Sequence, residues 1–89
     1  SDQDVFSQEL IAGDLIFIAF DQLTSPITAA AKIRYSAREA EAVITPLPEG
    51  KVQVNFTDPQ RAITPGQSVV FYDGDIVLGG GIITRVIKS

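Results

Sequence analysis

Three cations, an aromatic ring and an amide are the side chains of this sequence whose types suit contact with RNA. Lys32 and Arg34 are two positions apart, so on a β-strand they project from the same face. Tyr35 offers a ring for stacking on a base, and Gln60 offers an amide for hydrogen bonding. A tyrosine at a strand end is also often a lid on the core, and this alternative stays open. The predicted RNA contacts are Lys32, Arg34, Tyr35, Gln60 and Arg61.

A run of three glycines, Gly79-Gly80-Gly81, invites comparison with a loop that cradles a nucleotide phosphate. Such a loop works with a lysine and a following helix, and this run has neither. Glycines within a strand instead mark a bulge or a close crossing of two backbones, which barrel closure commonly requires. We interpret the run as structural.

An acidic pair, Asp73 and Asp75, is the other candidate for chemistry, because paired carboxylates share protons and attract hard cations. Two carboxylates without further oxygen ligands would hold a metal weakly. Asp73 also belongs to a turn signal, where an aspartate bonds backbone amides. We therefore expect solvated turn residues and no metal site, and a hydrolase built on this pair is disfavoured.

Several residue types with catalytic uses are missing from the sequence. Cysteine, histidine, methionine and tryptophan are all absent. This excludes disulfides, thiolate nucleophiles, imidazole acid–base chemistry and Cys/His zinc sites. We expect no catalytic residues and no cofactor site in this chain.

The charge balance is acidic, with seven Lys and Arg against eleven Asp and Glu and a formal net charge of −4. An autonomous nucleic-acid binder usually carries a basic patch, so charge alone favours a plain acidic surface and no DNA partner. No apolar run approaches the roughly 20 residues that span a bilayer, so we expect no membrane partner. The chain opens at Ser1 with no initiator methionine and no signal-peptide pattern before it, which suggests a piece of a longer protein.

Two hairpins are the clearest elements. Residues 51–56 alternate polar and apolar, which predicts a strand with Val52, Val54 and Phe56 facing inward. The β-branched run 42–45 precedes it, and a Pro/Glu/Gly turn joins the two. Runs 68–72 and 76–78 flank Asp73-Gly74, a dipeptide typical of a tight hairpin turn, and residues 64–67 predict a β-turn before them.

The first half of the chain is less clear. We expect a strand over 14–20, with Gly13 as its entry turn, and frayed ends at 1–8 and 85–89. Residues 27–35 combine a helix-like start at Ser25-Pro26 and helix-favouring alanines with the strand that the fold requires. Ser36 and Glu39 have capping-box spacing, so a single helical turn there stays open.

Five or six short strands with regular turn signals predict one all-β domain over residues 1–89. The predicted architecture is a small antiparallel barrel of about six strands, closed or partly open. Closure would protect the strand edges from pairing with other chains.

Three stretches of the sequence resemble the tRNA-specific 2-thiouridylases in order and spacing. They are FSQELIAGDL (Phe6 to Leu15), AKIRY (Ala31 to Tyr35) and DPQRAITPGQSVVFYDGDIVLGGGII (Asp58 to Ile83). The last looks like the closing signature of that family. The resemblance implies a C-terminal barrel of the translation-factor type, which follows an ATP-binding domain and a central domain that are absent here.

The resemblance also implies a function. Enzymes of the family activate the wobble uridine of certain tRNAs with ATP and Mg²⁺ and replace its 2-oxygen by sulfur carried as a cysteine persulfide. ATP, Mg²⁺ and the catalytic cysteines would belong to the absent domains, and a relay protein or cysteine desulfurase would supply the sulfur. We expect this chain to be an accessory tRNA-positioning domain of a cytoplasmic sulfurtransferase. The alternative is a protein-interaction module that docks a sulfur-relay partner or another subunit.

Overall fold

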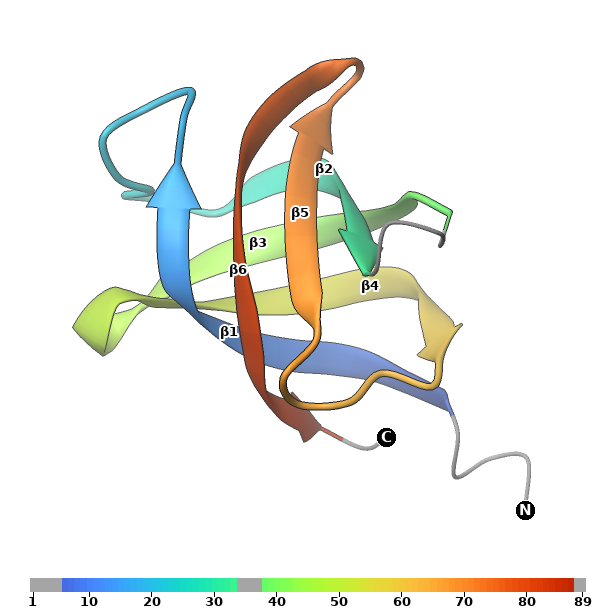
Figure 1. The fold of residues 1–89 in the computed structure, drawn as a ribbon. Helices are drawn as coiled ribbons and strands as arrows, with labels where there is room; N and C mark the ends of the chain where they lie inside the picture. The colour runs from blue at the N-terminus through green and yellow to red at the C-terminus, as the bar shows by residue number, and fades with distance from the viewer. Residues whose placement is uncertain (1–5, 34–37, 88–89) are drawn as a thin grey trace.

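The computed structural model describes residues 6–33 and 38–87, which form one antiparallel barrel of six strands (Figure 1). Around the barrel the order is β1-β4-β3-β2-β5-β6, and β6 pairs with β1 to close it. The strands are β1 (Phe6–Phe17), β2 (Ile27–Ile33), β3 (Ala40–Leu47), β4 (Lys51–Arg61), β5 (Ser68–Asp73) and β6 (Ile76–Ile87). The predicted all-β barrel is confirmed.

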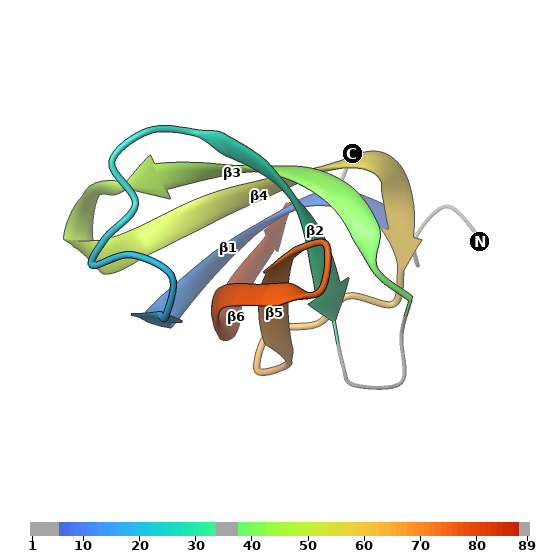
Figure 2. The ribbon, with the colours of Figure 1, turned by 90° about the horizontal axis from the view of Figure 1, so that it is seen from above.

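The core fills the inside of the barrel, around which the strands curve in Figure 2. Val52, Val54 and Phe56 of β4 are buried, as the alternation predicted, and the polar residues between them face outward. Each apolar side chain of this size contributes about 1.5–3 kcal/mol when it leaves water. The largest fully buried side chains are Phe71, Leu10, Ile44, Ile83, Val52, Val54 and Val69.

Both predicted hairpins are present. Leu47 pairs with Lys51 across a 3-10 turn, η2 (Pro48–Gly50), so the Pro/Glu/Gly turn is confirmed. In the other hairpin Asp73 pairs with Ile76, so the loop is Gly74-Asp75 and not the predicted Asp73-Gly74. Gly74 has φ 59°, which suits the first central residue of a two-residue hairpin loop.

The turn that precedes β5 is also present. The amide of Gln67 donates to the carbonyl oxygen of Thr64 at 3.4 Å, and the amide of Thr64 donates to the Gln67 side chain at 3.0 Å. Gly66 takes a φ of 93°, as expected for the third position of this turn. The predicted β-turn over 64–67 is confirmed.

Strand β1 differs from its prediction at both ends. It begins at Phe6 and ends at Phe17, so Gly13 lies inside the strand and is not an entry turn. The register with β6 shifts between Gly13 and Ile16, and Asp14 has φ 48°, so the glycine sits at an irregularity that bends the strand. A glycine at a bend and a glycine at a turn give the same local signal.

The prediction of frayed ends is wrong for the residues that the structure describes. Ser7 is buried in β1, and β6 continues to Ile87. The two strands pair with each other there, since Glu9 lies opposite Ile87. The first residues of β1 and the last residues of β6 are therefore paired strand residues, although their position near the ends of the chain suggested fraying.

Strand β2 settles the conflict between helix and strand. Residues 27–33 are extended and pair with β3 on one side and β5 on the other. Ala29 and Ala31 point into the core, so tertiary pairing overrides the helix propensity of the alanines. Ser36 lies outside the described residues. Arg38 and Glu39 belong to no helix, and the chain enters β3 at Ala40, so residues 38–42 contain no helical turn.

Candidate nucleic-acid interface

Lys32 lies on the outer face of β2. Its neighbours Ala31 and Ile33 are buried in the core, so alternation directs the lysine outward, where it is half-buried. Across the sheet it lies opposite Val70 of β5. The ammonium group of a lysine placed in this way reaches water while its methylene stem covers the sheet.

Arg34 and Tyr35, the other predicted contacts from this segment, lie outside the described residues. Whether they join Lys32 on one face stays a prediction.

Gln60 and Arg61 lie at the end of β4. The amide nitrogen of Gln60 donates to the carbonyl oxygen of Asp58 at 2.9 Å, so part of its hydrogen-bonding capacity is used locally. Arg61 is exposed, and its guanidinium carbon lies 5.9 Å from the centre of the Phe6 ring. An arginine stacked over a ring keeps its charge available on the surface.

The predicted contacts do not share one pair of strands. Strand β3 separates β2, with Lys32, from β4, with Gln60 and Arg61. Arg61 instead pairs with Phe6 of β1. Arg61 therefore lies neither on the strand of Lys32 nor on a strand next to it, and the two do not form the predicted basic spot.

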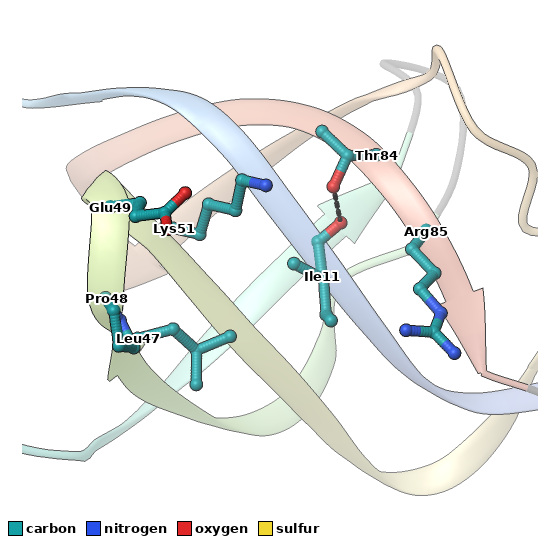
Figure 3. A pocket seen from close by; sticks show the side chains of 7 residues that line it. All are labelled: Ile11, Leu47, Pro48, Glu49, Lys51, Thr84 and Arg85. Carbon is teal, nitrogen blue, oxygen red and sulfur yellow. Dashed lines mark hydrogen bonds between the residues drawn. The ribbon is translucent and has the colours of Figure 1, made fainter.

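A hollow on the outer face was missed by reasoning from the sequence. It has a volume of about 470 Å³, is open to solvent, and crosses β4, β1 and β6 (Figure 3). Lys51 lies on one side of β1 and Arg85 on the other, with Ile11 between them (Figure 3). Its lining residues are Ile11, Leu47, Pro48, Glu49, Lys51, Thr84 and Arg85.

A bulge in β6 shapes this hollow. Ile11 pairs with Arg85 and Ala12 with Ile83, so Thr84 is the extra residue. The hydroxyl of Thr84 donates to the carbonyl oxygen of Ile11 at 3.2 Å and fixes the bulge against β1. A side-chain carbon at Gly13 would lie 3.4 Å from Thr84 Cγ2 and 3.8 Å from Lys51 Cγ, so Gly13 lies beside both of these lining residues.

The glycine run lies inside β6 and is packed against other backbones. A Cβ at Gly80 would lie 2.6 Å from the carbonyl oxygen of Val69, and one at Gly81 would lie 2.5 Å from that of Gly13. The register with β5 also shifts between Phe71 and Tyr72. The interpretation as a bulge and a close crossing is confirmed. This strand has no free loop to cradle a phosphate, so these residues do not fit ATP.

Asp73 and Asp75 lie at the tip of the β5–β6 hairpin, and both are exposed. Among the described residues, no group of three or more Asp, Glu, His or Cys side chains is placed to hold a metal ion. In the same part of the chain, no helix is long and apolar enough to span a membrane.

Fold and surface together define a small closed barrel with cations on its outer face. The profile of the family described as "Aminomethyltransferase beta-barrel domain" matches residues 7–83. The tRNA-specific 2-thiouridylase MnmA of Acetivibrio thermocellus is 66% identical over 82 residues, which are 92% of this chain and 23% of that protein. Its counterpart in Clostridium botulinum (strain Alaska E43) is 60% identical over 87 residues, which are 98% of this chain and 24% of that protein.

The chain thus spans about a quarter of the length of these curated relatives. It belongs to the aminomethyltransferase beta-barrel domain family, and within that family to the C-terminal domains of the tRNA-specific 2-thiouridylases. The resemblance noted in the sequence is confirmed.

Proposed function

We propose that this barrel positions tRNA within an ATP-dependent enzyme that replaces the 2-oxygen of the wobble uridine by sulfur. The observation that carries the proposal is the alignment of 98% of the chain, at 60% identity, with a tRNA-specific 2-thiouridylase. A likeness of this extent includes the outer surface as well as the core.

The contribution of the barrel is orientation. Holding two reacting groups in place is worth several kcal/mol without any catalytic side chain, up to about 7–11 kcal/mol in the best cases. ATP, Mg²⁺ and the persulfide-carrying cysteines would be held by other domains of the enzyme. A relay protein or a cysteine desulfurase would deliver the sulfur, and the enzyme would work in the cytoplasm.

Deletion of the barrel from the full-length enzyme tests this proposal. We expect weaker tRNA binding and slower thiolation, while ATP binding, which needs no residue of the barrel, stays unchanged. The matched control is the full-length enzyme with Asp75→Asn, a change at an exposed hairpin tip. Unchanged tRNA affinity and unchanged thiolation after the deletion would refute the positioning role.

A second candidate function is docking of protein, and exposed isoleucines favour it. Ile16 is 71% exposed, Ile18 is 72% exposed and Ile76 is 62% exposed. They come from neighbouring stretches of backbone, because the amide of Ile18 donates to the carbonyl oxygen of Leu78, two residues after Ile76 at the start of β6. Large apolar side chains exposed in one region of a small domain are typical of interaction surfaces. Each described strand has two neighbours in the closed barrel, so a patch is a better docking surface than a strand edge.

The occupant that we infer for this patch is the rest of the longer enzyme, since the chain spans only about a quarter of its relatives. Mixing the barrel with the remainder of the enzyme, as separate chains, tests this. We expect Ile16→Ser with Ile18→Ser to weaken their association at least tenfold, with Val43→Ser as the matched exposed control. If the double variant associates with the remainder of the enzyme as tightly as the unsubstituted barrel does, this occupant is refuted. It is also refuted if the double variant loses binding of a sulfur-relay protein instead.

A further inference from the structure

We propose that the hollow across β4, β1 and β6 is an anion site that holds a backbone phosphate of the tRNA, with Lys51 and Arg85 as its cations. This inference rests on the proposed function and names the face that serves it. The two cations come from strands that are neighbours of β1 on opposite sides. Their convergence on one hollow is therefore a product of the fold and not of sequence proximity (Figure 3).

The position of Arg85 is fixed by backbone pairing. Arg85 pairs with Ile11 of β1, and on its other side Ile11 pairs with Gln53 of β4. Its neighbour Thr84 forms the bulge and is tied to Ile11 by the hydroxyl bond of 3.2 Å. Bulges commonly aim a side chain at a functional site. Arginine also offers a planar fork of donors that matches two phosphate oxygens.

The charge of the hollow favours an anion, although the whole chain carries −4. Its lining holds two cations and one carboxylate, Glu49. The carboxylate of Glu9 is not part of this lining, and the side chain of Gln53 holds it by donating a bond of 2.9 Å to it. A local excess of positive charge on an acidic domain selects where a polyanion can lie.

The other lining residues suit a nucleotide. Ile11, Leu47 and Pro48 give the hollow an apolar floor, against which a ribose or a base can pack beside a held phosphate. A hollow of about 470 Å³ that is open to solvent accommodates part of a continuous chain. A backbone phosphate with its sugar matches both the floor and the cations.

This site is an alternative to the RNA-contact face around Lys32 that the sequence predicted. In the barrel order β1 and β2 are three strands apart in either direction, so the hollow and Lys32 lie on opposite sides. Arg61 belongs to the side of the hollow, since it pairs with Phe6 at the start of β1. Phe6 and Ile11 are five positions apart along the strand, a span of about 17 Å. One tRNA backbone can follow β1 from the hollow to Arg61, whereas it cannot reach Lys32 on the same face.

The test is tRNA binding across a salt series by the 89-residue chain and by the full-length enzyme. The test variant is Lys51→Gln with Arg85→Gln, and the matched control is Lys32→Gln. Both cations of the test variant are exposed, so the fold should persist, and thermal unfolding checks this. The closed barrel has its own continuous core, which supports using the chain alone.

We expect the double variant to bind tRNA roughly five- to tenfold more weakly at low salt, since each exposed charge contact is worth up to about 1 kcal/mol. The slope of log affinity against log salt should flatten by about one to two, because fewer counterions are released. Glu49→Gln should strengthen binding, and Lys32→Gln should change it less than twofold.

Equal affinity and equal salt slope for the double variant and the unsubstituted chain would overturn the site. A larger loss from Lys32→Gln than from the double variant would also overturn it, in favour of the opposite face. If barrel deletion slows thiolation but the double variant does not weaken binding, only this site fails. If deletion changes neither tRNA affinity nor thiolation, the proposed function fails with it.

Discussion

Gly80 of β6 lies against Val69 of β5 so closely that a Cβ on the glycine would be 2.6 Å from the carbonyl oxygen of Val69. That distance is shorter than van der Waals contact, and the neighbouring atom belongs to backbone, which cannot rotate away. The glycines on either side meet β1 instead, Gly79 at Ile16 and Gly81 at Gly13. The run therefore lets β6 approach both of its neighbours, and the barrel closes there.

We predict that Gly80→Ala destabilises the barrel by about 1–3 kcal/mol, because the added methyl group forces two strands apart. In a domain of this size, each kcal/mol lowers Tm by roughly 4–8 °C. Thermal unfolding followed by circular dichroism measures the change. Gly74→Asn is the control, since Gly74 has open space around it and asparagine tolerates its φ of 59°. Equal Tm values for Gly80→Ala and the unsubstituted chain would contradict the steric role of this glycine.

Phe71 is the largest of the fully buried side chains of the core. We predict that Phe71→Ala costs about 3–5 kcal/mol, from lost apolar burial and the cavity left behind. The free energy of unfolding of a whole domain is only about 5–15 kcal/mol, and a small domain lies near the lower end. A loss of this size should therefore leave the variant partly unfolded at 25 °C. Urea titration gives the free energy of unfolding. Phe6→Ala is the matched control, because Phe6 is 36% exposed, and a loss as large as that of Phe71→Ala would contradict the assigned core.

Thr84 joins the bulge of β6 to β1 through its hydroxyl, which donates to Ile11. We predict that Thr84→Val, which keeps the branched shape but removes the donor, lowers the free energy of unfolding by about 0.5–1.5 kcal/mol. Urea titration measures this change. Thr28→Val is a suitable control, since Thr28 is an exposed strand threonine. Equal effects of the two changes would mean that the hydroxyl bond contributes nothing specific.

The sequence predicted those parts of the fold that depend on local pattern. Alternation in β4 identified its inward residues, and Pro, Gly and Asp placed the turns of both hairpins to within one residue. It misplaced the start of β1, because the bend at Gly13 exists only where β6 approaches. For the same reason the hollow could not be predicted, since Lys51 and Arg85 meet only through the registers of β4 and β6 with β1.

The conflict between helix and strand over residues 27–33 yields the last prediction. Ala30 is half-buried on the outer face of β2, opposite Glu41 of β3 and Tyr72 of β5. Alanine favours helix, whereas threonine favours strand and packs beside an aromatic ring across the sheet. We therefore predict that Ala30→Thr stabilises the barrel by about 0.2–1 kcal/mol, seen as a rise in Tm.

The inward-facing Ala31 provides the control for this change. It is buried, so Ala31→Thr places a larger, polar side chain in the filled core and should destabilise the barrel by about 1–3 kcal/mol. The two variants make the same replacement at adjacent positions and should shift Tm in opposite directions. Shifts of the same sign would show that the strand does not alternate between core and solvent as the pairing with β3 and β5 requires.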